Sequence, residues 1–304
     1  MDIPSSNDEG EPGPAKTLFQ PYLLVLFFIF LLASCRQKED EVKLTLAGNT
    51  AHRISPKEIR LPVKKILQKK KIYLTFDDGP NKGTLNVFNA VKEDSIPASF
   101  FIVGKHVYDS PQQEAVFEEL KADTAIQLCN HSYTHALNHY TKFYQDPEKV
   151  VSDMEKNANE VGFNNAVVRM PGRNAWRIDT VRHTDIKESE AAIDSVHHAG
   201  FAVMGWDVEW QFDHKDLSLT TDTDQLLRQI ENMLASQKTK TSGHLVILAH
   251  DQAFQTPESL EKLHWLFRQL KNNPEYELEL AGNYPGIKNK APRSSVNPLP
   301  ANER

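Results

Sequence analysis

The sequence has few cysteines, no excess of positive charge and no long apolar run, and each shortage narrows what the chain can be. Only two of its 304 residues are cysteine, which is too few for a disulfide framework. The formal net charge is −6, so nothing in the composition favours a nucleic-acid partner. No fixed-period repeat or heptad run occurs, and no obligate protein partner is evident. The length suits one large domain or two small ones.

The longest apolar run, residues 22–32, is shorter than the roughly 20 residues that a comfortable membrane span needs. It suits a signal-peptide core, because small residues and then Cys35 follow it at once. The stretch L-A-S-C resembles the lipobox of bacterial lipoproteins. That resemblance implies cleavage before Cys35, lipidation of its sulfur, and a mature protein tethered to a membrane outside the cytoplasm, on the periplasmic side or the cell surface. An uncleaved membrane anchor is the less favoured alternative.

Composition divides the chain into four parts. Residues 1–35 are expected to be a disordered leader followed by the lipoprotein signal peptide. Residues 36–69 are expected to be a tether, because no pattern there buries apolar side chains. Residues 70–284 form the predicted folded domain. Residues 285–304 are rich in Pro and Asn and are expected to be a disordered tail.

Strand and helix patterns alternate through the folded part, which predicts an α/β fold with a parallel sheet, either open or closed into a barrel. The predicted strands are residues 71–76, 98–103, 124–129, 166–169, 201–206, 243–249 and 276–280. The predicted helices are residues 84–93, 111–122, 147–161, 187–199, 223–236 and 257–270. In either arrangement, functional residues are expected at the carboxyl ends of the strands.

Polar clusters follow five of the predicted strands. They are D-D-G at 77–79, H-S-Y-T-H at 131–135, R-M-P-G-R at 169–173, W-D-V-E-W at 206–210 and A-H-D at 249–251. The adjacent carboxylates of Asp77 and Asp78 repel each other unless a cation lies between them or one holds a proton. His131 and His135 are four residues apart, so on a helical turn both imidazoles would face one metal ion. Arg169, if buried, needs a carboxylate partner, and Asp77 would supply it.

In this order, the clusters resemble the motifs of the NodB-homology polysaccharide deacetylases, carbohydrate esterase family four. T-F-D-D-G at 75–79, H-S-Y-T-H at 131–135 and L-A-H at 248–250 match the family pattern, and the resemblance spans roughly residues 70–282. It implies a distorted (β/α) barrel of about seven parallel strands. It also implies metal-dependent removal of acetyl groups from sugars.

The resemblance further implies a metal site and a general base. Asp78, His131 and His135 would bind one divalent ion, zinc by preference, with cobalt, manganese or nickel as alternatives. This ligand set leaves coordination positions open for water and substrate. Asp77 would be the general base, and Arg169 would hold it in position.

The resemblance also implies four further roles in the active site. The backbone N–H of Gly172 would meet the oxyanion, and His250 would be the general acid that protonates the leaving amine. Leu248 and Trp210 would line the acetyl pocket. The fourth motif departs from the family pattern, and either Asp207 or Glu209 could orient His250; the adjacency of Glu209 to a tryptophan favours Glu209.

Three other features are expected to have no part in the chemistry. Cys129 is expected to be inert packing, and the polar segment 177–189 is expected to be a loop beside the cleft. The histidines at 139, 183, 197, 198 and 214 match no motif and are expected to be surface or hydrogen-bonding residues.

The predicted function is deacetylation of an amino-sugar glycan at the bacterial cell envelope, with peptidoglycan N-acetylglucosamine or a chitin-type polymer or oligomer as the substrate. An O-acetyl xylan esterase is one alternative. A catalytically weak carbohydrate-binding relative that keeps the metal site is another.

Overall fold

The computed structural model describes residues 68–288. The leader 1–35 with Cys35, nearly all of the predicted tether and the tail from residue 289 lie outside these residues. The predicted domain end at 284 is slightly early, because Ile287 N–H still donates to the carbonyl of Tyr284 and Ile287 packs against the core. Among the helices of residues 68–288, none has both the length and the apolar character to cross a membrane.

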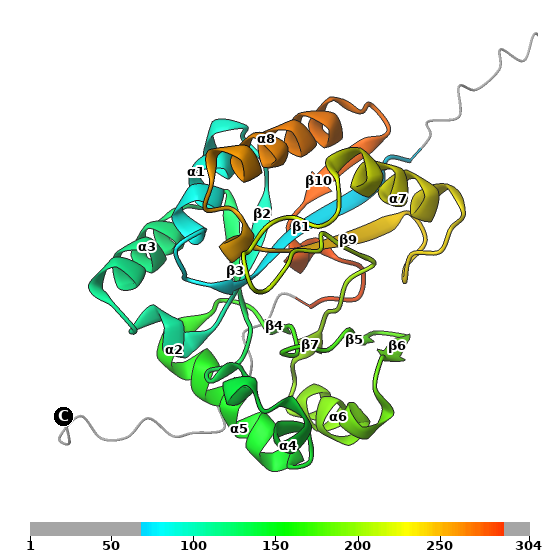
Figure 1. Ribbon diagram of the computed structural model, residues 1–304. Helices are drawn as coiled ribbons and strands as arrows, with labels where there is room; N and C mark the ends of the chain where they lie inside the picture. The colour runs from blue at the N-terminus through cyan, green and yellow to red at the C-terminus, as the bar shows by residue number, and fades with distance from the viewer. Residues whose placement is uncertain (1–67, 289–304) are drawn as a thin grey trace, which may run out of the picture. The chain divides into compact units, whose positions relative to one another are not determined.

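Ten strands form one mixed sheet in the order β6-β5-β7-β4-β3-β2-β1-β9-β8, and β10 also pairs with β1 (Figure 1). The strands are β1 (Lys70–Gly79), β2 (Ala98–Ile102), β3 (Ile126–Asn130), β4 (Val167–Val168), β5 (Ala175–Ile178), β6 (Val181–Thr184), β7 (Ala202–Val203), β8 (Val208–Glu209), β9 (His244–His250) and β10 (Tyr276–Glu279). The strand pairs are parallel except for β5 with β6 and β5 with β7. The β5–β6 hairpin corrects the loop expected within residues 177–189, and β8 is a further strand that was not predicted.

Eight α-helices accompany the sheet in the described part. They are α1 (Thr84–Glu93), α2 (Gly104–Val107), α3 (Pro111–Ala122), α4 (Tyr140–Tyr144), α5 (Pro147–Asn157), α6 (Glu190–His198), α7 (Thr223–Ala235) and α8 (Pro257–Asn272). Local capping explains why several begin where they do. The side chains of Ser110, Asp146 and Thr256 accept backbone N–H groups at the starts of α3, α5 and α8, and Pro opens each of these helices.

Two predicted helices end or begin differently. The α-helical geometry of α5 stops at Asn157, and a π-helical turn, Ala158–Gly162, continues it to a glycine with φ of 77°. A short 3₁₀ turn, Lys187–Ser189, precedes α6. Hydrophobic spacing indicates only a helical period, so it does not separate these tighter and wider turns from α-helix.

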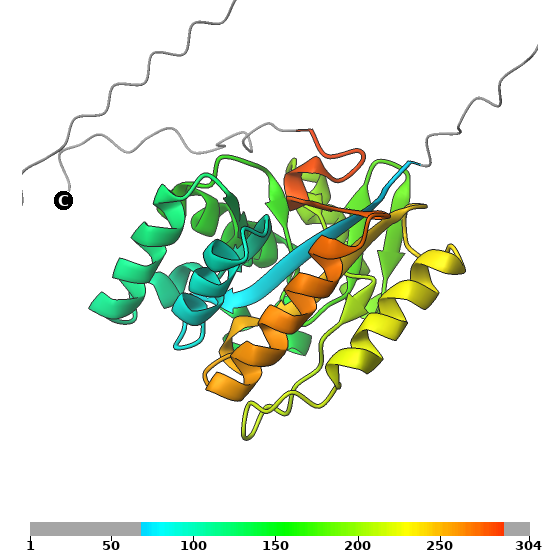
Figure 2. The same ribbon diagram turned by 90° about the horizontal axis from the view of Figure 1, so that it is seen from above.

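Strand β1 pairs with β2, β9 and β10, and it is covered on both faces. Ile72, Leu74 and Phe76 belong to the core cluster that α1 and α8 also supply. Tyr73, between them in sequence, belongs to a second cluster on the opposite face, with Val246 and Cys129. Figure 2 shows α7 and α8 running along one side of the sheet. The face that carries Tyr73 is called the inner face below.

Candidate active site

The carboxyl end of β1 carries the two adjacent aspartates. Successive side chains of a regular strand point to opposite faces, so Asp77 and Asp78 would ordinarily diverge. The pairing of β1 with β2 shifts register between Asp77 and Gly79, and Asp78 has a φ of 75°. A bulge of this kind re-aims a side chain. Both carboxylates therefore face His131, whose Nε2 lies 3.6 Å from Oδ2 of Asp77 and 3.4 Å from Oδ1 of Asp78.

His131 and His135 come from the segment that follows β3. The predicted helical turn between them is wrong: Ser132 has a φ of 67°, and the chain between the two histidines is a loop. The loop nevertheless brings the rings to a centroid distance of 5.1 Å. His135 Nε2 lies 3.1 Å from Oδ1 of Asp78. One side-chain atom from each of Asp78, His131 and His135 lies within 4.8 Å of the other two.

These three residues fit a divalent metal ion. Nδ1 of His131 lies 2.9 Å from the carbonyl oxygen of Arg169 and must donate to it, which leaves the Nε2 lone pair facing Asp78. Asp78 Oδ1 is buried and accepts no hydrogen bond within the described residues, although two imidazole nitrogens lie close to it. Donor atoms that converge without a proton aligned between them suit a cation.

The electrostatics of these groups are strongly coupled. Burial raises the pKa of Asp78, but the neighbouring His131 and His135 outweigh it and hold that pKa well below its ordinary value. Burial lowers the pKa of His131, but the carboxylates of Asp77 and Asp78 outweigh it and raise that pKa above the ordinary value. Both shifts arise because opposite charges compensate here for lost hydration.

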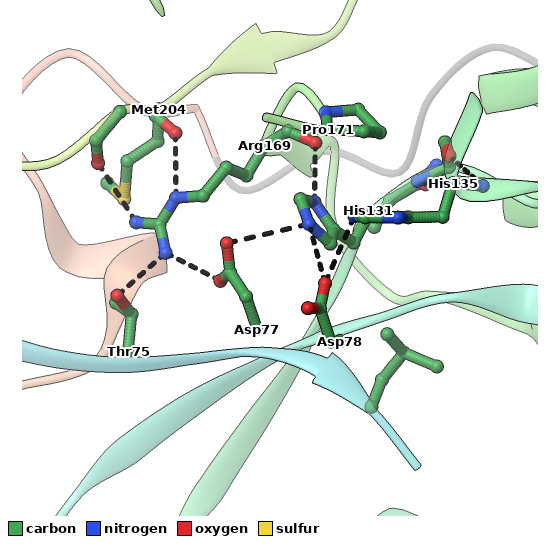
Figure 3. A network of polar contacts seen from close by, with 12 residues as sticks. Thr75, Asp77, Asp78, His131, His135, Arg169, Pro171 and Met204 are labelled. Atoms are coloured by element: carbon green, nitrogen blue, oxygen red, sulfur yellow. Dashed lines mark hydrogen bonds and ion pairs between the residues drawn. The ribbon is translucent and has the colours of Figure 1, made fainter. Parts of the chain in front are cut away.

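Arg169 is fully buried behind Asp77 and uses four of its N–H groups (Figure 3). Its Nη1 donates to Oδ1 of Asp77 at 2.7 Å and to Oγ1 of Thr75 at 2.8 Å. Its Nε and Nη2 donate to the carbonyls of Met204 and Gly205 at 3.2 and 2.9 Å. One oxygen of Asp77 is thus held by the guanidinium, while the other faces His131.

His250 ends β9 and is the register partner of Asp77 on β1. In-register neighbours on adjacent parallel strands point to the same face, so the base and acid candidates lie side by side. The ring of His250 packs against Phe212, with centroids 5.1 Å apart. Its Nδ1 is buried and has no hydrogen-bond partner among the described residues.

Neither acidic candidate orients His250 in this structure. Asp207 accepts the backbone N–H groups of Lys240, in the loop before β9, and of Val246, within β9, both at 2.9 Å. Its carboxylate therefore holds that loop and the strand together. Glu209 is the register partner of Leu248, on the inner face, but it makes no hydrogen bond or ion pair within residues 68–288. The expected Glu209–His250 contact is therefore absent from this part of the chain as described.

The two residues that were predicted to line the acetyl pocket lie on opposite faces of the sheet. Leu248 is a buried inner-face residue of β9. Trp210 instead belongs to the core on the opposite face, where its Nε1 donates to the carbonyl of Thr221 and its ring packs on Phe254. Its predicted placement in the acetyl pocket is wrong, because Trp210 points to the same face of the sheet as Val208, two residues earlier, and that face is the one opposite to the inner face.

Gly172 forms the turn after Pro171. It has a φ of 60°, and a Cβ there would lie 3.0 Å from the ring of Tyr140. The Tyr140 ring contacts His135 edge-on at 5.8 Å, so Gly172 borders the same group of residues. Both the left-handed backbone and the tyrosine contact explain why glycine occupies this turn.

A polar pocket of about 420 Å³ opens beside Asp78 and His135. Two histidines that match no motif, His106 and His214, line it. Nδ1 of His106 lies 2.8 Å from the backbone carbonyl of Asp78 and must donate to it. Neither residue could be assigned from spacing, because α2 and the loop after β8 reach the pocket only through tertiary folding.

Asp251 is a buried residue that holds the turn after β1 in place. Its carboxylate accepts the side chains of Asn81 and Thr84, which belong to the turn that follows the aspartates. Burial raises its pKa to about 7, although these hydrogen bonds lower it. A Cβ at Gly79 would lie 2.7 Å from a carboxylate oxygen of Asp251, so the turn packs tightly on this residue.

Cys129 is fully buried in the inner-face cluster, and burial raises the pKa of its thiol. This environment agrees with the expected packing role, since a thiol that stays protonated is a poor nucleophile and a poor metal ligand.

The chain is similar in sequence and in structure to proteins of known function. The profile of the polysaccharide deacetylase family matches residues 64–173. A peptidoglycan-N-acetylglucosamine deacetylase of Bacillus cereus is 28% identical over 224 residues, covering 70% of this chain and 69% of the relative. A chitooligosaccharide deacetylase of Rhizobium leguminosarum is 40% identical over 65 residues, or 21% of this chain and 28% of the relative.

The fold agrees with a solved structure. A CE4 esterase from Streptococcus mutans superposes with a TM-score of 0.53 at 19% identity, covering 70% of this chain and 87% of that one. The predicted distorted (β/α) barrel is confirmed as a curled mixed sheet with helices. The prediction of about seven parallel strands is close, and the antiparallel β5–β6 hairpin is the main addition.

Proposed function

We propose that this chain, which belongs to the polysaccharide deacetylase family of hydrolases, removes N-acetyl groups from an amino-sugar glycan by metal-dependent hydrolysis at the cell envelope. The observation that carries the proposal is the convergence of Asp78, His131 and His135 beside the Asp77–Arg169 pair. The relatives that act on peptidoglycan N-acetylglucosamine and on chitooligosaccharides support an amino-sugar substrate.

Asp78, His131 and His135 would hold the divalent ion, zinc by preference. When bound, the ion supplies Lewis-acid chemistry to the attacking water and the acetyl carbonyl. Nδ1–H of His131 is fixed by the carbonyl of Arg169, which keeps Nε2 available. His106 donates to the backbone carbonyl of Asp78 and so helps to fix the position of this ligand.

Asp77 takes the proton of the attacking water. Arg169 holds Oδ1 of Asp77 at 2.7 Å, so Oδ2 is the oxygen free to act as general base. His250, beside Asp77 on the neighbouring strand, donates a proton to the leaving sugar amine. The backbone N–H of Gly172 stabilises the oxyanion, and Leu248 lies along the inner wall.

Glu209 is proposed as the residue that orients His250 once substrate is bound. Its register partner, Leu248, lies two residues before the acid on the same face of β9, and Glu209 makes no competing contact within the described residues. This role makes Glu209 a positioning residue. The unpartnered Nδ1 of His250 also favours a second candidate function, a glycan-binding protein with weak catalysis, because a poorly oriented acid donates inefficiently.

Acetate release from a panel of substrates separates these functions. The panel contains peptidoglycan, N-acetylglucosamine oligomers and O-acetylated xylan, and it compares the wild type with Asp77→Asn. We expect release from the amino-sugar substrates, with Asp77→Asn keeping its metal but losing turnover. Asp78→Ala should lose both. Silence of the wild type on the whole panel, with glycan binding retained, would favour the binding protein instead.

A lipid anchor on Cys35 is proposed to place the domain outside the cytoplasm. The L-A-S-C stretch after the apolar run supports it. Incorporation of a labelled fatty acid that disappears in Cys35→Ala is the expected result. Equal labelling of the two proteins would refute the anchor without affecting the proposed reaction.

A further inference from the structure

The segment directly after His135 has an unusual backbone. His135, Ala136, Leu137 and Asn138 have φ values of 52°, 56°, 48° and 59°, all in the left-handed region. L-amino acids visit this region as single residues and rarely in succession, because Cβ approaches the following carbonyl oxygen. None of the four is glycine. We call residues 135–138 the left-handed turn.

The surrounding structure imposes the left-handed turn. Oδ2 of Asp153, on α5, accepts the backbone N–H groups of Tyr133 and Thr134 at 3.0 and 3.1 Å. Oγ of Ser132 accepts the N–H of His135 at 2.9 Å. Ala136 is buried in the cluster formed with α5 and α6. A strained backbone that neighbouring groups hold in place is typical of functional sites.

The consequence of this backbone is the position of Leu137. Its side chain is 58% exposed, more than any other large apolar side chain in residues 68–288. It lines the 420 Å³ pocket together with Asp78 and His135. A leucine that is held out to solvent beside candidate metal ligands has no packing role, since burial in the core would favour it more.

The other walls of the pocket are mostly polar, and the ring of Tyr140 also lines them. They carry Lys105, His106, Asp109 and His214. Sugar rings present an apolar face of C–H groups and a polar edge of hydroxyl groups, so a pocket that combines an apolar side chain with several hydrogen-bonding groups matches them. An apolar ligand would leave those polar groups unpaired, which is costly.

We infer that Leu137 is a substrate-contacting residue, presented by the left-handed turn, that packs on the apolar face of a glycan sugar ring bound in this pocket. The inference rests on the proposed function. It predicts that Leu137 contributes to binding of oligomeric substrate and not to metal binding or to the chemistry of the acetyl group.

The test uses Leu137→Ala and Leu137→Asn, with Leu85→Ala as the matched control. Leu85 is 36% exposed on α1 and is not among the residues that line the pocket. Asn tolerates left-handed backbone well, so Leu137→Asn keeps the turn while removing the apolar contact. Each protein is assayed with an N-acetylglucosamine tetramer and with a small aryl acetate, and its zinc content is measured.

We expect both Leu137 variants to raise KM for the tetramer about tenfold, the loss of one apolar contact. Their zinc content, their kcat and their activity on the aryl acetate should match those of Leu85→Ala. An unchanged KM in either Leu137 variant would overturn the inference while the active wild type leaves the proposed function standing. A wild type that releases no acetate from the tetramer would instead refute the proposed function, and the inference with it.

Discussion

Arg169 offers a sharp test of how the base candidate is held. Arg169 and Asp77 form an ion pair of 2.7 Å in which the side chains are 0% and 3% exposed. Removing one partner of a buried pair leaves an uncompensated charge and typically costs about 3–5 kcal/mol. Arg169→Met also leaves the carbonyls of Met204 and Gly205 without a hydrogen-bond donor, which adds about 1–3 kcal/mol if water does not reach these acceptors. We therefore expect Arg169→Met to lower the free energy of unfolding by at least about 4 kcal/mol.

The double variant with Asp77→Asn separates charge from packing. If the cost of Arg169→Met lies mainly in the unpaired carboxylate, neutralising Asp77 should recover about 2 kcal/mol or more of it. Equilibrium urea unfolding would be followed by tryptophan fluorescence, since Trp176 and Trp210 are both buried. A chelator present throughout removes any metal contribution. Additivity of the two single variants within about 0.5 kcal/mol would refute the ion-pair reasoning.

Three other changes have distinct expected outcomes. His106→Ala should weaken zinc binding about tenfold by releasing the carbonyl of Asp78, whereas exposed His198→Ala should not; competition with a chelator measures this, and equal affinities would contradict it. Asp251 has a folded pKa of about 7, above its unfolded value of about 4, so its contribution to stability is full below pH 4 and is lost as pH rises through 7. Thermal unfolding across this range should show Asp251→Asn gaining on the wild type as pH rises, and a constant difference would count against the assignment. Cys129 should resist iodoacetamide in the native protein and react after denaturation, as peptide mapping would show; rapid native labelling would be inconsistent with its burial.

Much of the fold follows from local chemistry that is visible in the sequence. Helices α1 and α3 were predicted at their observed bounds, and the caps at Ser110, Asp146 and Thr256 are local signals. The clustering of polar residues after strands was also predictable, because carboxyl ends of parallel strands meet at one edge. These features depend on residues that are close in the chain or on the general geometry of parallel sheets.

What could not be predicted depends on tertiary structure. Both faces of the sheet are covered, so alternation does not reveal which face a residue such as Trp210 joins. The bulge that turns Asp78 toward His131 has no local signal beyond the following glycine. The β5–β6 hairpin was not predicted because its sequence is polar. Its Arg177 can be buried only because it forms ion pairs with Glu190 and Asp194 on α6. Such pairings appear only once distant segments have met.

The pairing of β1 has a consequence for how the chain acquires its fold. Tyr73 of β1 bonds to His244 of β9, 171 residues later in the chain. At synthesis rates of about 5–20 residues per second, β1 waits roughly 10–30 s before that partner exists. During this time, the edge of β1 that pairs with β9 is open to aggregation. Among the strands of residues 68–288, the one that carries both aspartates is thus made first, and it gains its last partner, β10, only after β9. We therefore expect productive folding to depend on release of the whole chain or on a chaperone that protects β1 until β9 and β10 are available.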